Sequence, residues 1–309
     1  MFSFKGITAV GGLLLMGPGY YPETTVEGLA ASAAFISFIN VFGGFIVTKR
    51  MLDMFKRPTD PPEYNYLYGV PGVTFLGSYA WAVSQGYPEV HQMAYLTSSL
   101  CCVGALAGLS SQSTGRLGNA LGIMGVSGGV AATLGSILPG SPGLVQIAGV
   151  ASGGALIGST IAHRIEITDL PQLVAAFHSL VGMAAVLTCV ATYIDHFPSF
   201  ATDPAATMIK TSIFLGTYIG GVTFSGSLIA YGKLQGMLSS APLLLPGRHA
   251  LNGGLMAANV GCMGYFLMDP TYNVGISMLG STSALSAIMG VTLTMAIGGS
   301  YLLSVCRGG

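Results

Sequence analysis

Long apolar runs recur along this chain, and each is long enough to cross a membrane. A transmembrane helix needs about 20 mostly apolar residues. Runs of this length predict about nine full spans, near residues 26–48, 66–85, 92–110, 117–137, 143–162, 171–193, 211–232, 250–268 and 277–299. A shorter run at 6–17 predicts a partial helix. The runs therefore predict an all-α fold, a polytopic transmembrane helical bundle.

The composition supports this fold class and excludes several functions. Charged residues make up 7% of the chain, whereas a soluble domain carries about 25%. The 46 glycines suit close packing of transmembrane helices. The net charge is zero, so nothing indicates a nucleic-acid partner. The cysteines have no metal-ligand spacing, and no glycine-rich phosphate motif opens a helix after a strand, so neither a metal nor a nucleotide site is expected.

The basic residues are distributed unevenly over the predicted loops. Nine fall in alternate loops, all on one side of the bundle: Lys49, Arg50, Lys56, Arg57, Arg116, Arg164, Lys233, Arg248 and Arg307. Lys210 falls on the other side, and Lys5 is ambiguous. By the positive-inside rule, the basic side faces the cytoplasm, or the matrix in a mitochondrion.

His178 is the sharpest candidate for chemistry. Thr168 or Asp169 can cap its helix, and Pro171 fits the first turn. The histidine then lies about two turns in, within the hydrocarbon layer. An ionisable group there marks a pathway or relay by default, and histidine titrates near neutral pH, as a proton carrier must. The alternative is a neutral histidine that hydrogen-bonds to a neighbouring helix.

A run of small and hydroxyl residues forms the second candidate site. Gly216 and Gly220 share a helix face, and Thr223, Ser225 and Ser227 follow them. Hydroxyl groups that line a cavity could hold water beside a proton-carrying histidine, but packing alone explains the spacing equally well. Asn259, inside the span at 250–268, could line a water path or bridge two helices, and we favour the bridge.

The segment from Lys49 to Tyr68 combines a basic helix end with a stiff connector. Its first part suits anionic lipid headgroups. Pro58 to Pro62 make its second part extended. We expect contact with headgroups here rather than catalysis.

Four long segments carry a family resemblance. They are residues 47–68, 101–110, 169–187 and 216–249. Through them the chain resembles, over roughly residues 5–299, the membrane domain of proton-translocating NAD(P) transhydrogenase in its mitochondrial, animal form. The resemblance implies an enzyme that couples proton translocation across the inner mitochondrial membrane to hydride transfer between NADH and NADP+.

The resemblance also implies roles for particular residues. The histidine of the Ala-Phe-His-Ser-Leu-Val-Gly motif, His178 here, and the serine that matches Ser227 are implicated in proton translocation. Thr223, Ser225 and Asn259 are secondary candidates for the same path. Arg248 and His249 belong to a loop on the side where the nucleotide-binding domains dock.

The expected organisation is a proton-channel domain at 1–299, truncated at both ends, and a divergent tail at 300–309. Because the NAD(H)- and NADP(H)-binding domains are missing, we expect this chain to bind no cofactor and to be inactive alone. NAD and NADP belong to the complete enzyme. The resemblance implies a homodimer in the mitochondrial inner membrane, with basic loops facing the matrix. The alternatives are a non-catalytic fragment and a secondary transporter, which would show paired broken helices and a polar site at the midplane.

Overall fold

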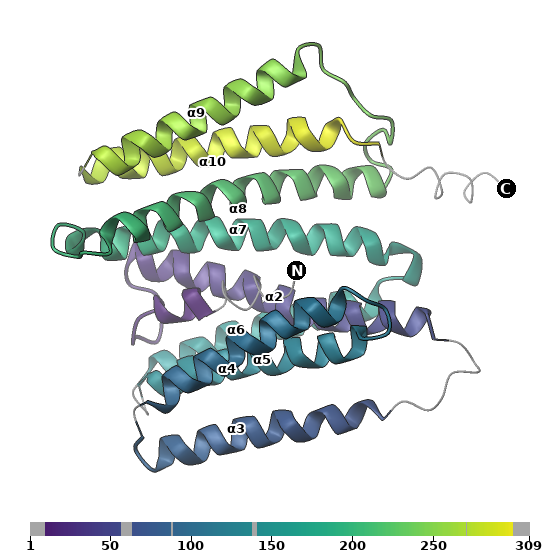
Figure 1. The fold of residues 1–309 in the computed structure, drawn as a ribbon, viewed down its shortest axis with the longest axis vertical. Helices are drawn as coiled ribbons and strands as arrows, with labels where there is room; N and C mark the ends of the chain where they lie inside the picture. The colour runs from purple at the N-terminus through teal and green to yellow at the C-terminus, as the bar shows by residue number, and fades with distance from the viewer. Residues whose placement is uncertain (1–9, 57–63, 88, 138–140, 270, 299–309) are drawn as a thin grey trace. The chain divides into compact units, whose positions relative to one another are not determined.

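The computed structural model describes residues 10–56, 64–87, 89–137, 141–269 and 271–298, which form helices joined by loops and turns (Figure 1). No strand occurs among these residues. The chain divides into two compact units, Met1–Ile167 (unit 1) and Thr168–Gly309 (unit 2). The expected partial helix is helical over 10–14, and its start lies outside the described residues, as does the tail at 300–309.

Unit 1 is built from paired helices. Its elements are α2 (Thr25–Met54), η1 (Asn65–Tyr68), α3 (Gly69–Ser84), α4 (Val90–Leu109), α5 (Gly115–Ser136) and α6 (Gly143–Arg164). Helix α2 packs on α6, and α4 packs on α5. The second pair approaches closely because glycines meet: a Cβ added to Gly108 would lie 2.7 Å from the Cα of Gly118. A capping box formed by Thr24 and Glu27 begins α2.

The described part of unit 2 contains four long helices, each packed against the next in a row. After η2 (Ile167–Asp169) come α7 (Leu170–His196), η3 (Phe197–Ser199), α8 (Ala206–Leu234), α9 (Arg248–Met268) and α10 (Tyr272–Met295). Helix α8 lies between α7 and α10, and α9 packs on α10 (Figure 1). Tyr193 of α7, Phe214 of α8 and Phe266 of α9 form the centre of a buried aromatic cluster near one end of these helices.

Seven described helices are long and apolar enough to cross a membrane. The prediction of a polytopic helical membrane protein is therefore confirmed, whereas the count of nine spans is not. Each of the nine predicted spans falls on a helix, but α3 and α9 are not among the seven. Helix α3 has 16 residues, which gives about 24 Å, less than the hydrocarbon layer of about 30 Å. Helix α9 includes Arg248, Asn252 and Asn259, which lower its hydropathy.

Basic side chains gather at one end of each unit. In unit 1, Arg50 donates to the carbonyl oxygens of Ala162 (2.6 Å) and Ile165 (2.9 Å), and Arg116 pairs with Asp53 at 2.8 Å. These contacts bring the basic ends of α2, α5 and α6 together.

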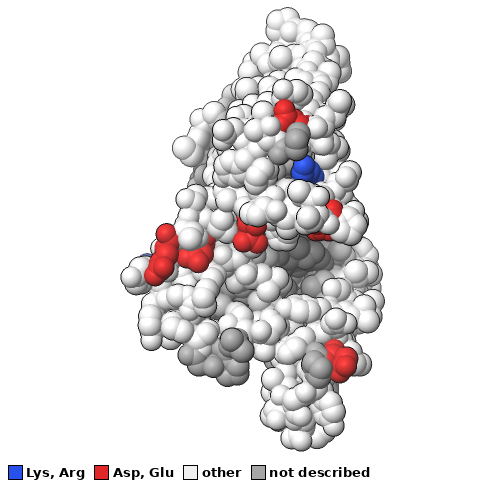
Figure 2. All heavy atoms as spheres, turned by 90° about the vertical axis from the view of Figure 1, so that its left-hand side faces the viewer, with Lys and Arg blue, Asp and Glu red and all other residues white. Residues whose placement is uncertain are grey.

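In unit 2, Lys233 binds carbonyl oxygens at the end of α10. Lys210 lies near the opposite end of α8, with its Nζ atom 5.2 Å from the centre of the Phe200 ring. Where charge shows on the face drawn in Figure 2, it is mostly carboxylate.

Candidate functional site

His178 lies on α7, in the first half of the helix. Pro171 stands in the first turn as expected, but Asp169, the residue before the helix, makes no capping hydrogen bond through its side chain. His178 comes eight residues after Leu170, which places it about 12 Å along the helix. The residue is half-buried and its Nδ1 atom is buried.

Helices α7 and α8 touch through glycine. A Cβ added to Gly182 would lie 2.6 Å from the carbonyl oxygen of Gly220, and one added to Gly220 would lie 2.8 Å from that of Gly182. Neither helix has room for a side chain at this crossing, so the two backbones are in direct contact. Such contact is typical of small residues at helix interfaces within membranes.

The contacts along α7 and α8 fix which residues face each other. Near one end, a Cβ added to Gly216 would meet the sulfur of Cys189 at 2.5 Å. Near the other end, Gln172 donates to the carbonyl oxygen of Leu234 at 3.1 Å. The two helices therefore run antiparallel, and one residue forward on α7 matches one residue back on α8.

This register places His178 opposite Ser227. Eleven residues before Cys189 is His178, and eleven residues after Gly216 is Ser227. Residues spaced by four or seven share a helix face, so His178 lies on the Gly182 face of α7 and Ser227 on the Gly220 face of α8. Both residues are half-buried and lie on the facing sides of one interface.

The other two hydroxyl candidates on α8 separate from each other. Thr223 stands four residues before Ser227 and shares its face. Ser225 lies on a different face, because a Cβ added to Gly290 of α10 would collide with its Oγ atom. Ser225 is 7% exposed and donates to the carbonyl oxygen of Gly221 at 3.1 Å. It therefore belongs to the contact between α8 and α10, away from His178.

Asn259 is deeply buried on α9, with 2% of its surface exposed. Its amide donates to the carbonyl oxygen of Leu255 at 2.9 Å, in its own helix, and its Oδ1 atom accepts no hydrogen bond from the described residues. The bridge that we expected of Asn259 is made two turns earlier by Asn252, which accepts a bond from Thr292 of α10 at 2.7 Å. Sequence reasoning did not single out Asn252.

Arg248 and His249 begin α9, directly after Gly247, whose φ of 70° is left-handed. The Nε atom of Arg248 lies 3.3 Å from Nε2 of His249, which is exposed. The loop before them is tied to α10 by a bond from the Leu243 amide to the Met295 carbonyl oxygen at 2.9 Å.

Lys233 lies at the same end of unit 2. Sequence reasoning counted it only as a basic loop residue and did not predict its contacts with α10. It is 7% exposed, and its ammonium group donates to the carbonyl oxygens of Met295 (2.8 Å) and Ile297 (2.6 Å). A cation at a helix C-terminus satisfies carbonyl groups that lack partners within the helix and compensates the helix dipole.

The apolar helices and their glycine contacts define a polytopic α-helical membrane protein. The family model of the NAD(P) transhydrogenase beta subunit matches residues 91–305. A second family model, of the 4TM region of mitochondrial pyridine nucleotide transhydrogenase, matches residues 2–57. The chain therefore belongs to the NAD(P) transhydrogenase beta subunit family, which confirms the resemblance seen in the sequence.

Bacterial relatives show the same similarity. The NAD(P) transhydrogenase subunit beta of Rhodospirillum rubrum is 40% identical over 160 residues, which are 50% of this chain and 34% of that protein. The subunit from a designated strain of the same bacterium matches equally. The chain thus spans about a third of the length of these relatives.

Proposed function

We propose that this chain is the membrane part of a proton-translocating NAD(P) transhydrogenase, in which His178 and Ser227 carry the proton across the middle of the membrane. The observation that supports the proposal is the α7–α8 register, from which we infer that the two residues stand at facing positions of the two helices. An imidazole titrates near neutral pH. A hydroxyl group both donates and accepts hydrogen bonds, so Ser227 can hold the histidine in either protonation state.

The remaining candidates have subordinate roles. Thr223 extends the polar face of α8 by one turn, in the direction of Gly220. Ser225 lies at the contact of α8 with α10. Asn259 stands seven residues after Asn252, which bonds to α10, and its own amide bonds within α9. We therefore assign both residues to helix packing rather than to the proton path.

Coupling in this proposal is conformational. Protonation of His178 and the nucleotide state of the docked domains bias the same equilibrium between two forms of the bundle. Hydride transfer from NADH to NADP+ is chemistry of the nicotinamides and needs no residue of this chain. Activity is therefore proposed for the assembled protein, a homodimer in the mitochondrial inner membrane, and not for this segment by itself.

The loop before α9 is the proposed route between the docked domains and the proton site. Arg248 and His249 would contact the domains on the matrix side, where the positive-inside rule places the basic ends. Lys233 links the end of α8 to the end of α10, and Leu243 links the loop to α10. A domain that moves this loop therefore acts on α8 at Lys233, six residues beyond Ser227.

A secondary transporter is the competing proposal. That class uses broken helices around a substrate site at the midplane. Helices α7 and α8 run unbroken over 27 and 29 residues, and the polar groups at their interface are few. These features suit a proton better than a metabolite.

The test is a double-mutant cycle in the assembled transhydrogenase. We expect the double variant His178→Gln with Ser227→Ala to lower coupled turnover no further than His178→Gln alone, because residues that act as one unit are not additive. Turnover would be measured in proteoliposomes from NADPH formation. Effects that multiply independently would contradict the pairing of the two residues.

A further inference from the structure

Unit 1 contains a groove at its basic end that the proton site does not use. Two adjoining cavities, of about 830 and 500 Å³, lie among the end of α2, η1 with the start of α3, and the first half of α5. They share the side chains of Leu52, Asn65, Tyr68 and Arg116, so they form one continuous depression.

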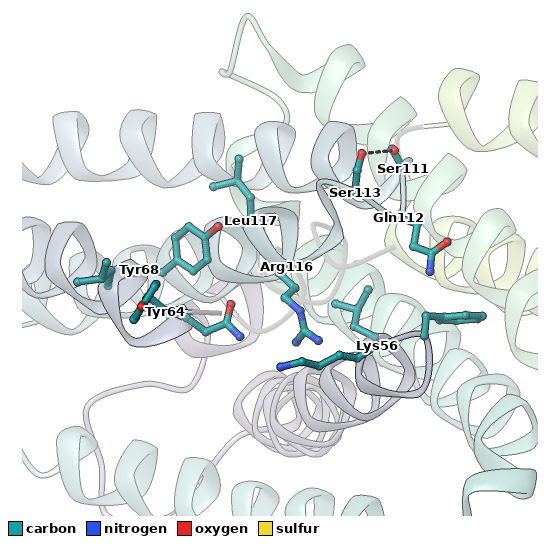
Figure 3. Close-up of a pocket in the computed structure, with 12 residues that line it drawn as sticks. Lys56, Tyr64, Tyr68, Ser111, Gln112, Ser113, Arg116 and Leu117 are labelled. Atoms are coloured by element: carbon teal, nitrogen blue, oxygen red, sulfur yellow. Dashed lines mark hydrogen bonds between the residues drawn. The ribbon is translucent and has the colours of Figure 1, made fainter. Parts of the chain in front are cut away.

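The mouth of this groove is cationic. Figure 3 shows Lys56 and Arg116 pointing into the same space, with Tyr64 and Tyr68 to one side. Lys49 lines the second cavity. Arg116 also pairs with Asp53. Among the described residues, three cations therefore face one carboxylate, and their charges sum to a positive value at the mouth.

The floor of the groove is apolar and follows the helices away from the mouth. The second cavity continues along α3 past Gly72 and Leu76, and along α5 past Ala120 and Met124 as far as Ser127. From Arg116 to Ser127 the helix rises about 16 Å. Val73, on this side of α3, is 73% exposed, so the floor opens laterally to the bilayer.

The aromatic residues fix the depth of the mouth. Tyr64, Tyr66 and Tyr68 are exposed by 59%, 73% and 37% in the short segment before α3. Tyrosines collect at the level of lipid headgroups, where the ring is apolar and the hydroxyl group reaches water. The mouth is cationic and lies at headgroup depth, and the apolar floor enters the hydrocarbon layer. The groove is therefore complementary to an amphiphile with an anionic head and an apolar chain.

We propose that this groove binds an anionic phospholipid, with its phosphate at Lys49, Lys56 and Arg116 and an acyl chain along α3 and α5. A free phosphate would leave the apolar floor uncovered. A phosphatidylcholine has a zwitterionic headgroup, and its quaternary ammonium would meet a mouth that is already positive. The proposal requires only that unit 1 spans the membrane, and it does not depend on the proton role of His178.

The test compares two lipids of equal acyl chains on the purified, assembled protein. Phosphatidylglycerol or phosphatidylcholine is added to the protein in detergent, and bound lipid is counted by native mass spectrometry. We expect phosphatidylglycerol to bind about tenfold more tightly. Equal binding of the two lipids would overturn the proposal.

Two kinds of variant separate the mouth from the floor. Lys49→Gln with Lys56→Gln should weaken phosphatidylglycerol binding about tenfold, because each basic residue attracts the anionic headgroup. Lys210→Gln, which removes one positive charge in unit 2, is the control and should leave binding unchanged. Ala120→Phe keeps every charge and fills the apolar floor of the groove, so it should weaken the binding of both lipids. An unchanged affinity in either groove variant, with wild-type circular dichroism, contradicts the proposal.

Competing occupants give different results. Displacement of the lipid by millimolar inorganic phosphate would mean that the site recognises phosphate alone. Quantitative cross-linking between copies through Val73→Cys, with no lipid retained, would mean that a second chain covers the groove. Either result overturns the assignment, and neither bears on coupled turnover.

Discussion

Gly182 of α7 and Gly220 of α8 lie in direct backbone contact, so that a Cβ on Gly182 would approach the carbonyl oxygen of Gly220 to 2.6 Å. This crossing lies between the Cys189–Gly216 contact and the Gln172–Leu234 hydrogen bond. It therefore holds the register that sets His178 opposite Ser227.

The first prediction concerns this crossing. Gly182→Ala should destabilise the protein by about 1–3 kcal/mol, because the methyl group meets backbone atoms that cannot move independently. The measurement is the free energy of unfolding in mixed micelles. Gly280→Ala on α10 is the matched control, since nothing lies within 4 Å of its added Cβ. Equal stability of the two variants would show that the helices are not in contact at Gly182.

A second prediction concerns the buried lysine at the end of α8. Lys233→Met should lower stability by about 1–3 kcal/mol, because two charge-assisted hydrogen bonds are lost. Amide hydrogen exchange should also rise in the last turn of α10 and at Leu243, which depends on the Met295 carbonyl oxygen. Lys210→Met is the control, since its contact with Phe200 is worth about 1 kcal/mol or less. Unchanged exchange at Leu243 would refute the proposed link between the loop and α8.

The third prediction separates two serines that differ by two positions. Ser227→Ala should lower coupled turnover by about tenfold, the effect of a lost hydrogen bond to a charged group. Ser225→Ala removes the same atom from the contact with α10, and coupled turnover should stay near wild type. If Ser225→Ala were the more damaging change, the proton path would lie between α8 and α10.

A fourth prediction follows from Asp269, at the C-terminal end of α9. Hydrogen bonds from the side chain and the backbone amide of Thr271 lower the pKa of Asp269, and Lys210 lowers it further. Because this pKa lies below that of the unfolded chain, the stabilisation is present above the unfolded value, about 3.9. It is lost as pH falls through the folded value.

The carboxyl ¹³C shift of Asp269 measures this pKa. We expect a titration midpoint below that of a model aspartate, and a rise toward the ordinary value in Thr271→Ala. A midpoint unaffected by Thr271→Ala would assign the shift to another group.

Helix positions could be predicted well because apolar length is a local property. The run at 117–137 became α5, and the run at 171–193 became most of α7. The count of spans was less certain, because α3 ends after 16 residues and α9 carries polar side chains. The division into two units has no local signal.

The candidate site could be predicted only in part. The depth of His178 follows from helix rise, and the face of Ser227 follows from its spacing to Gly220. That these two residues lie opposite each other depends on contacts between two helices, which no periodicity reveals. Lys233 and Met295, 62 residues apart, meet for the same reason. The choice between Asn252 and Asn259 as the bridge likewise required the position of Thr292.

The most direct test of the central claim is proton uptake by proteoliposomes that contain the assembled transhydrogenase with His178→Ala. A pH-sensitive dye inside the vesicles would report protons moved while NADH reduces NADP+. Proton movement and the coupled rate should both fall to background, while NADP(H) still binds and the protein keeps its native mass. Proton uptake at the wild-type rate, sensitive to a protonophore, would contradict the proton role of His178.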